Sequence, residues 1–307
     1  MKKVIVTGAT GFLGKKLVND LLKNSVEVYA IVRDIAKANK FDNSENLHIV
    51  QCNMNQYYKL DQLINEEKLD TFYHFAWEGT AGCKRENYSI QLNNVKCSCD
   101  ALYAAKRMKV KKFIFAGSII EYEAEKSIEK DISKVNMSSI YGLAKRNAKN
   151  MIKVISKNIG MNCSILNISN IFGVGEKSER LINYIINNLM NNKKVRLSPC
   201  KQLYDFIYID DAIEAIKLVG EKGRDLEEYY IGNPKPKKLL DFVNEIGEIF
   251  NKKELLVIGA IEFNGISLTY KEFNTESLFK EFNFTTKVTF KEGIKKTIEW
   301  YKKGMIE

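Results

Sequence analysis

The N-terminal fourteen residues constrain the fold of this chain more than any other stretch. Lys3–Thr7 is a short run rich in β-branched residues with no charge after its first position, which predicts a buried strand. The run leads directly into the glycine-rich segment Gly8–Gly14. A helical pattern follows, with one apolar face formed by Leu13, Leu17, Val18, Leu21 and Leu22. A strand, a glycine-rich turn and a helix in this order predict a dinucleotide-binding site.

The glycines of this turn have separate roles. Gly8 permits the tight turn, Gly11 lets the backbone approach a pyrophosphate, and Gly14 lets the helix pack closely on the strand. The helix N-terminus adds unpaired N–H groups and a partial positive charge that suit an anion. The spacing is G-x-x-G-x-x-G rather than G-x-G-x-x-G. From this segment we expect six cofactor-binding residues: Gly8, Thr10, Gly11, Phe12, Leu13 and Gly14.

The composition argues against several other classes of protein. The 307 residues can bury a large core, and no apolar run reaches the length of a membrane span. The apolar run after the two N-terminal lysines is interrupted at once by the glycine-rich segment, so we do not expect a signal peptide. The formal charge of +10 comes from lysines spread along the chain, without the basic, aromatic-interleaved patch of a nucleic-acid site. We therefore expect a cytoplasmic, globular protein that binds neither nucleic acid nor a membrane.

The cysteines and histidines indicate no metal or disulfide chemistry. None of the six cysteines belongs to a C-x-x-C pair, which favours reduced thiols. Only His48 and His74 are present, and two histidines leave little scope for a histidine metal site. We expect His74, in a predicted buried strand, to have a structural role.

Strand and helix patterns alternate along the first part of the chain. We expect strands over residues 3–7, 26–32, 47–51, 70–76, 112–118 and 162–168. This alternation predicts an α/β fold with a Rossmann-type, doubly wound parallel sheet. After residue 168 the pattern changes to a loop, a helix over 181–190, a helix capped by Asp210 or Asp211, and a last helix over 291–302. We expect a dinucleotide-binding domain over 1–168 and a smaller, mixed substrate-binding lobe over 169–307, with some return of the chain to the sheet.

Arg33 stands just past the second expected strand, where this kind of fold places the adenosine ribose. An acidic side chain there accepts hydrogen bonds from a free 2′-hydroxyl, whereas an arginine can grip a 2′-phosphate with two parallel N–H bonds. Arg33 therefore favours NADP(H), with NAD(H) possible. Asn53 follows the third expected strand, and its amide can bond the edge of the adenine.

Tyr141 and Lys145 are four residues apart on an expected helix, so their side chains share one face. A phenol titrates at about 10, and a neighbouring ammonium lowers that pKa by favouring the phenolate. The tyrosine can then exchange a proton with a substrate oxygen while hydride moves to or from a nicotinamide. Ser118, at the end of the fifth strand, can hydrogen-bond the same oxygen. Alone, this spacing is equally typical of an ordinary helix surface pair.

The order of these motifs resembles the short-chain dehydrogenase/reductase superfamily. Thr7–Gly14 is similar to the nucleotide turn of its extended branch, the NAD-dependent epimerase/dehydratase family. Asn94-Val95, on an expected helix over about 86–108, resembles the family's Asn-Val motif, which implies that Asn94 supports the active site and contacts the cofactor region. The resemblance implies a catalytic set of Asn94, Ser118, Tyr141 and Lys145, with Lys145 also bonding the nicotinamide ribose. The strand ending in His-x-Ala implies that Ala76 lies under the cofactor, and the loop after it makes Trp77 and Glu78 candidates for substrate binding. Asn53 replaces the family's usual Asp.

The later motifs point to the sugar-nucleotide-modifying branch of this family. Asn170–Gly175 is similar to its Asn-x-Tyr-Gly-Pro-Gly loop, which implies that Asn170 contacts a substrate diphosphate. Tyr204–Asp211 resembles its Arg-Asp-Phe-x-x-Val-x-Asp segment, but Tyr204 stands where the family has an arginine for the pyrophosphate. Arg180 or Lys201 is then expected to take over, and Asn167 replaces another frequent arginine. The resemblance implies a nucleotide-sugar substrate and a homodimer.

Three functions stay open. The family's 4,6-dehydratases carry Thr-Asp-Glu after the fifth strand, whereas this chain has Ser118-Ile119-Ile120, and isoleucine cannot transfer a proton. We therefore set dehydratase activity aside and favour an NADPH-dependent reductase of a nucleotide-linked 4-keto-6-deoxy sugar. The alternatives are a 4-epimerase of nucleotide sugars that uses bound NAD, and an NADP-binding sensor or scaffold without catalysis.

Overall fold

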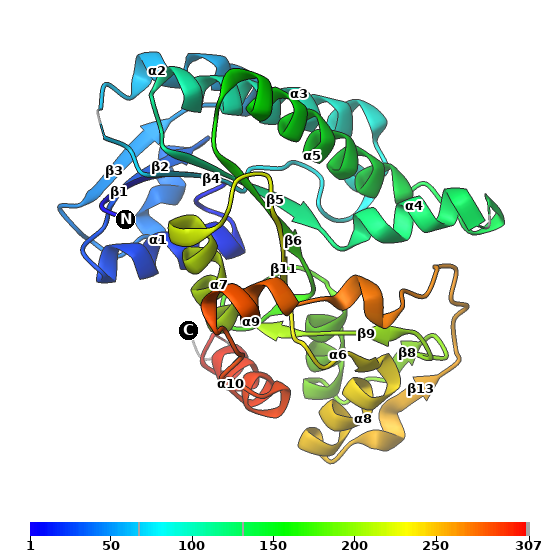
Figure 1. Ribbon diagram of the computed structural model, residues 1–307. Coiled ribbons are helices and arrows are strands. Elements are labelled where there is room, and N and C mark those ends of the chain that lie inside the picture. The colour runs from blue at the N-terminus through cyan, green and yellow to red at the C-terminus, as the bar shows by residue number, and fades with distance from the viewer. Residues whose placement is uncertain (67, 131, 305–307) are drawn as a thin grey trace. The chain divides into compact units, whose positions relative to one another are not determined.

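The computed structural model describes residues 1–66, 68–130 and 132–304 (Figure 1). The chain divides into two compact units. The first unit comprises Met1–Glu125, Asn136–Ile168 and Ile213–Tyr229. The second unit comprises Lys126–Val135, Ser169–Ala212 and Tyr230–Glu307. The chain thus leaves the first unit after Ile168 and returns to it at Ile213.

A seven-stranded sheet forms the centre of the first unit. In chain order its strands are β1 (Lys3–Thr7), β2 (Glu27–Val32), β3 (Leu47–Gln51), β4 (Thr71–His74), β5 (Lys112–Ser118), β6 (Cys163–Ile168) and β11 (Glu228–Ile231). Their spatial order is β11-β6-β5-β4-β1-β2-β3, and β1 to β6 run parallel. Strands β4 and β5 are buried along their whole length, as parallel strands covered on both faces are. The strand order reverses between β1 and β4, which is the switch point where such sheets bind ligands.

Helices cover both faces of this sheet. The helices of this part are α1 (Phe12–Lys23), α2 (Leu60–Leu63), α3 (Tyr88–Arg107), α5 (Ser139–Ile159) and α7 (Ile209–Lys222), with 3₁₀ turns η1 (Ile35–Lys40), η2 (Met54–Lys59) and η3 (Cys83–Arg85). Helices α3 and α5 lie side by side over one face, where Leu102 and Ile152 share a core with Phe113 of β5 (Figure 1). On the other face, Lys217 of α7 forms a salt bridge of 2.5 Å with Asp20 of α1. The doubly wound α/β fold expected from the sequence is confirmed.

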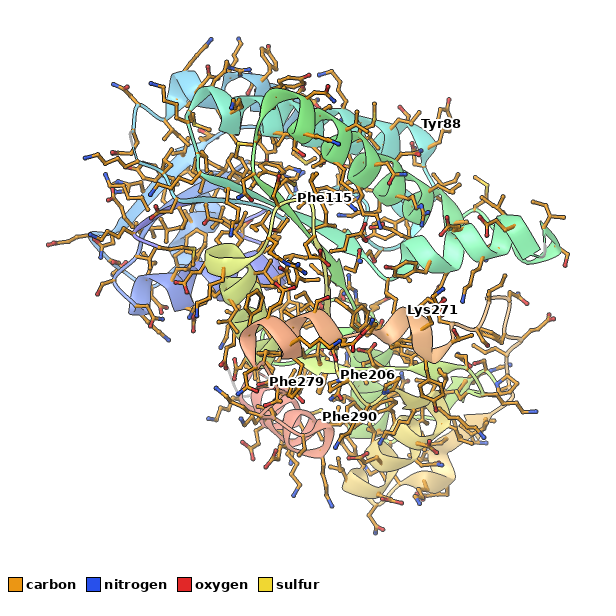
Figure 2. All side chains as sticks on the ribbon, viewed as in Figure 1. Tyr88, Phe115, Phe206, Lys271, Phe279 and Phe290 are labelled. Carbon is orange, nitrogen blue, oxygen red and sulfur yellow. The ribbon has the colours of Figure 1, made fainter. Side chains whose placement is uncertain are left out.

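The second unit has a mixed architecture. Its strands are β7 (Ile171–Phe172), β8 (Val195–Leu197), β9 (Leu203–Tyr204), β10 (Ile207–Tyr208), β12 (Lys237–Lys238) and β13 (Leu256–Ile258). Its helices are α6 (Leu181–Met190), α8 (Leu239–Phe250), α9 (Glu276–Phe282) and α10 (Phe290–Lys303), with 3₁₀ turns η4 (Ile132–Lys134), η5 (Lys253–Leu255) and η6 (Tyr270–Phe273). An aromatic core joins Phe206, Phe242 and Phe290, whose ring centroids lie 4.7–5.5 Å apart. Figure 2 labels Phe206 and Phe290 of this core.

Helix α4 (Ile120–Lys130) has no counterpart among the elements expected from the sequence. The run Ile119–Tyr122 is too short to show a helical period. In the structure, Glu121 and Glu123 occupy the first turn of this helix, where negative charge suits the helix dipole. Strand β7 likewise lies inside residues 170–175, which we expected to form only a loop.

The expectation that Asp210 or Asp211 caps a helix is wrong. Helix α7 begins at Ile209, so both aspartates lie inside its first turn. The Asp211 carboxylate instead accepts hydrogen bonds from the backbone N–H groups of Lys287 (3.1 Å) and Val288 (2.9 Å). Within the described residues, no helix is long and apolar enough to cross a membrane.

Candidate active site

The glycine-rich turn between β1 and α1 leaves no room for side chains at two positions. Gly8 has φ +67°, and a Cβ there would lie 2.8 Å from the backbone nitrogen of Ala76. A Cβ on Gly14 would lie 2.2 Å from the carbonyl oxygen of Gly8. The Gly11 N–H closes the turn by donating to Gly8 O at 3.0 Å. The turn therefore packs backbone to backbone against the end of β4 and the first turn of α1.

The N-terminus of α1 is suited to an anion. The helix begins at Phe12, with Gly11 as its N-cap residue and no side chain bonded to the cap. Its first turn carries no acidic residue. No negative side chain of the first turn therefore neutralises the positive end of the helix dipole or the first N–H groups, which include those of Phe12 and Leu13. A pyrophosphate site requires this arrangement. Thr10 precedes this N-terminus within the same turn.

Arg33 and Asn53 follow neighbouring strands at the same edge of the sheet. Arg33 is exposed directly after β2, and its guanidinium makes no hydrogen bond or salt bridge with any residue that the structure describes. Asn53 is exposed after β3, and its side chain makes no bond to the 3₁₀ turn that it precedes. The Cys52 N–H donates to Val32 O at 2.9 Å, which holds the two strand ends together. Both side chains are thus available to a ligand.

Helix α3 anchors the loop that follows β4. The Asn94 amide donates to Glu78 O at 2.8 Å, and its oxygen accepts from Glu78 N at 2.9 Å. Gln91 accepts from the Trp77 indole N–H at 2.8 Å and donates to Gly79 O at 2.9 Å. Both amide side chains are fully buried, so the loop has a defined conformation. Asn94, which we expected among the cofactor-binding residues, holds the substrate-loop candidate Glu78, whereas Gln91 holds Trp77.

His74 is buried and links β1, β4 and α3. Its Nδ1 lies 2.9 Å from Thr7 Oγ1, and its Nε2 lies 3.0 Å from Ser98 Oγ. Thr7 Oγ1 also accepts from the N–H of Ala76 at 3.3 Å. Burial, with a smaller effect of the Lys145 charge, lowers the pKa of His74 to about 3. The imidazole is therefore neutral at physiological pH and ties β1 and β4 to α3.

Three candidate catalytic side chains lie at the carboxyl end of β5 and on α5. Ser118, Tyr141 and Lys145 are all buried. Lys145 Nζ donates to Ala116 O at 2.7 Å and lies 3.8 Å from the centre of the Trp77 ring. The Trp77 and Tyr141 rings are in edge contact, with centroids 6.2 Å apart. The indole therefore contacts both residues of the Tyr-x-x-x-Lys pair, and burial lowers the pKa of Lys145 to about 7 against an opposing effect of Glu121.

Glu121 is a residue of this region that the sequence analysis missed. Its carboxylate accepts from the Ser118 N–H at 2.8 Å and forms a salt bridge of 2.9 Å with Lys149. A Cβ on Gly117 would lie 2.8 Å from the same carboxylate, so only glycine fits there. Lys149 follows Lys145 by one helical turn, and this i,i+4 spacing was the available signal.

The ion pairs of Lys149 extend to Glu228 of β11, at the edge of the sheet. Lys149 lies 3.1 Å and Lys153 lies 2.6 Å from the Glu228 carboxylate. Although burial opposes the ionised form, these two ammonium groups lower the pKa of Glu228 to about 2. Asn167 donates to Glu228 at 2.9 Å and to the Tyr122 hydroxyl at 3.0 Å. The amide at the position where the family often has an arginine is therefore part of this network.

The remaining substrate-site candidates belong to the second unit. Asn170 accepts through its carbonyl from Ile207 N at 3.2 Å. Arg180 precedes α6, and its exposed guanidinium lies 3.9 Å from Glu176. The Tyr204 ring in β9 lies 5.3 Å from the Phe206 ring. Asp205, between Tyr204 and Phe206, is fully buried and accepts hydrogen bonds from the Ser169 hydroxyl and the Asn233 N–H. Burial raises the pKa of Asp205 to about 6, although these hydrogen bonds act in the opposite direction.

Metal chemistry has no obvious centre in the described part of the chain. Within residues 1–66, 68–130 and 132–304, no group of three or more His, Cys, Asp or Glu side chains is placed to hold a metal ion.

This chain is similar in sequence to known proteins. The model of the NAD dependent epimerase/dehydratase family matches residues 4–232. A trifunctional UDP-glucose 4,6-dehydratase/UDP-4-keto-6-deoxy-D-glucose 3,5-epimerase/UDP-4-keto-L-rhamnose-reductase of Arabidopsis thaliana is 22% identical over 98% of this chain and 47% of its own length. A dTDP-D-glucose 4,6-dehydratase of Dictyostelium discoideum is 27% identical over 80% of this chain and 62% of its own. The chain thus spans about half to three-fifths of these relatives.

A solved structure shows the same fold. The dTDP-glucose 4,6-dehydratase of Bacillus anthracis, crystallised with NAD, superposes with a TM-score of 0.82 at 21% sequence identity. The similarity covers 100% of this chain and 98% of that one.

Proposed function

This chain belongs to the NAD dependent epimerase/dehydratase family, and we propose that it is an NADPH-dependent reductase of a nucleotide-linked 4-keto-6-deoxy sugar. The observation that carries the proposal is the contact of Trp77 with both Lys145 and Tyr141 at the carboxyl ends of β4 and β5. This contact brings a phenol and an ammonium group together in one buried place, and the buried Ser118 ends β5. These are the groups that a carbonyl reduction needs for proton transfer and for holding the oxygen.

The residues present fit a nicotinamide dinucleotide. The turn at Gly8 and Gly14 has no room for a Cβ, and the α1 N-terminus has no side-chain cap, which suits a pyrophosphate. Gly11 and Ala76 supply backbone at the same turn, and the exposed guanidinium of Arg33 suits a 2′-phosphate. We propose NADP(H), with NAD(H) as the alternative. When bound, the cofactor supplies hydride.

Within the chain, Tyr141 delivers the proton to the substrate oxygen. Ser118 donates a hydrogen bond that holds this oxygen, and its backbone is held by Glu121. Lys145 sits on the same face of α5 as Tyr141 and favours the phenolate when it carries its proton. The Trp77 ring covers Lys145 and excludes water from the ammonium group.

Elimination chemistry is disfavoured at the same place. Ile119 is buried and Ile120 begins α4, where the dehydratase pattern has two carboxylates. Neither side chain transfers a proton. A 4-epimerase with bound NAD is the second candidate, because Tyr141 and Lys145 serve oxidation and reduction equally, whereas Arg33 favours the reductase.

We propose that residues 1–168 bind the dinucleotide and residues 169–307 bind the nucleotide sugar. Asn170, Arg180 and Tyr204 are the candidate contacts within the latter segment. We also propose a homodimer, because α3 and α5 expose apolar side chains on their outer faces: Tyr88, Leu92, Met151 and Val154. Six free thiols suit a reducing, cytoplasmic location.

A cofactor assay tests the function. Purified protein is mixed with NADPH or NADH and dTDP-, CDP-, GDP- or UDP-linked 4-keto sugars, and loss of the reduced nicotinamide absorbance is followed. Oxidation of NADPH that depends on one sugar nucleotide supports the reductase. A product that differs only in stereochemistry, without net oxidation, supports the epimerase instead.

A further inference from the structure

Arg85 lies over the ring of the candidate catalytic tyrosine and has an unused donor. Its Cζ is 4.8 Å from the centre of the Tyr141 ring, which is a cation–π distance. Its Nε is buried and has no hydrogen-bond partner among the residues that the structure describes. An unsatisfied buried donor destabilises the folded state, and more so when it belongs to a charged group. A ligand that supplied an acceptor at this point would remove that penalty.

Hydrogen bonds hold the backbone around Arg85 in place. The Arg85 N–H donates to Gly82 O at 3.0 Å and closes the 3₁₀ turn η3. Gln91, itself fully buried on α3, donates to Lys84 O at 3.1 Å. Lys84 also forms a salt bridge of 2.9 Å with Glu78 in the same loop. The turn that carries Arg85 therefore has a fixed backbone.

The charge of Arg85 already has a carboxyl group nearby. Glu123 of α4 is half-buried, and although burial raises its pKa to about 7, the Arg85 charge acts in the opposite direction. The Arg85 charge therefore interacts with the Glu123 carboxyl group beside Tyr141.

We propose that Arg85 is a substrate-binding residue that donates a hydrogen bond to a carbonyl or hydroxyl oxygen of the sugar, next to the carbon whose oxygen meets Tyr141. The proposal rests on the proposed function, since it takes Tyr141 as the residue that meets the substrate. It assigns a substrate-binding role to a loop residue that belongs to none of the family-like motifs.

The test is a binding comparison that needs no turnover. Affinities of UDP, UDP-glucose, dTDP, dTDP-glucose and NADPH are measured by calorimetry for wild type, Arg85→Gln and Arg85→Lys. Arg224→Gln is the matched control, because that side chain is 64% exposed and forms a salt bridge of 3.4 Å with Glu227. We expect both Arg85 variants to bind the preferred glucose nucleotide about tenfold more weakly, which corresponds to about 1.4 kcal/mol. Affinities for the nucleoside diphosphate alone and for NADPH should stay within about twofold.

Each outcome has a separate meaning. Equal loss of diphosphate and sugar-nucleotide binding, or no loss at all, overturns the role of Arg85 while the proposed function stands. If wild type binds no sugar nucleotide, the proposed function and this inference both fail. Arg85→Lys keeps the positive charge over Tyr141, so its affinities test the role of Arg85 if Arg85→Gln does not fold.

Discussion

The ammonium nitrogen of Lys145 lies 3.8 Å from the centre of the Trp77 ring and donates a hydrogen bond to Ala116 O at 2.7 Å. This neighbourhood solvates a positive charge poorly, and burial lowers the pKa of Lys145 from 10.5 to about 7. Between these values the unfolded chain binds one more proton than the folded protein, so the free energy of unfolding rises with pH across this window. Below pH 7 the penalty of the buried charge is complete.

The first prediction concerns this pH dependence. In Lys145→Met the side chain has no charge at any pH, so the variant lacks the penalty. We expect the Tm of the variant relative to wild type to be highest at pH 6 and to fall steadily toward pH 10. Calorimetric scans over that range measure it, with Lys106→Met on the exposed side of α3 as the control. A Tm difference that did not vary with pH would contradict a lowered pKa of Lys145.

Tyr141→Phe should lower turnover strongly and leave cofactor binding intact. The change removes the phenolic proton and keeps the ring that contacts Trp77. General acid catalysis contributes about 10²–10⁴-fold, so we expect a fall of kcat in this range. NADPH affinity, followed by fluorescence, should change less than about twofold. Normal turnover by this variant would exclude proton transfer by Tyr141.

Arg33→Asp should weaken NADPH binding far more than NADH binding. The variant loses a charge-assisted contact and places a carboxylate near the 2′-phosphate. We expect the ratio of the two affinities to shift by at least about 100-fold, or about 2.7 kcal/mol. Arg224→Asp, on an exposed loop, is the control for the change of net charge. Equal losses for both cofactors would argue against a 2′-phosphate contact.

Glu121→Gln should destabilise the first unit. Glu121 and Lys149 are both buried, and removal of one member of a buried pair costs about 3–5 kcal/mol. The corresponding surface change Glu125→Gln, which breaks the half-buried pair with Arg146, should cost less than about 1 kcal/mol. Urea unfolding of both variants gives the comparison, and similar losses for the two would mean that the Glu121 network adds little.

The exposed face of α5 should carry the subunit contact. Met151 and Val154 are exposed apolar residues on this helix. Introducing Glu at both positions would bury two charges in a dimer, so we expect dissociation to a monomer in light scattering. Ile261→Glu in the second unit is the control, because Ile261 is an equally exposed apolar residue. A wild-type monomer, or an unchanged dimer in the variant, would rule out this face.

Local pattern was sufficient for most of the sheet. Strands β1 and β3 and helix α6 have the predicted ends, and α10 differs by one residue at each end. These elements follow from neighbours in the chain: β-branched runs, apolar periodicity and a glycine-rich turn. Helix α4 was missed because Ile119–Tyr122 shows no period, and its first turn depends on Glu121 bonding back to the Ser118 N–H. The site residues taken from motifs remain predictions.

Amino-acid order alone determined that this chain folds as an alternating α/β sheet with a dinucleotide-type turn at Gly8–Gly14, because strand, turn and helix signals act over a few neighbouring residues. Only the tertiary structure decided which distant side chains meet. Trp77 reaches Lys145, and Lys149 reaches Glu228, because the order of β4, β5, β6 and β11 in the sheet brings their elements together. Burial and charge at such contacts depend on packing across the whole unit, and no local pattern encodes them.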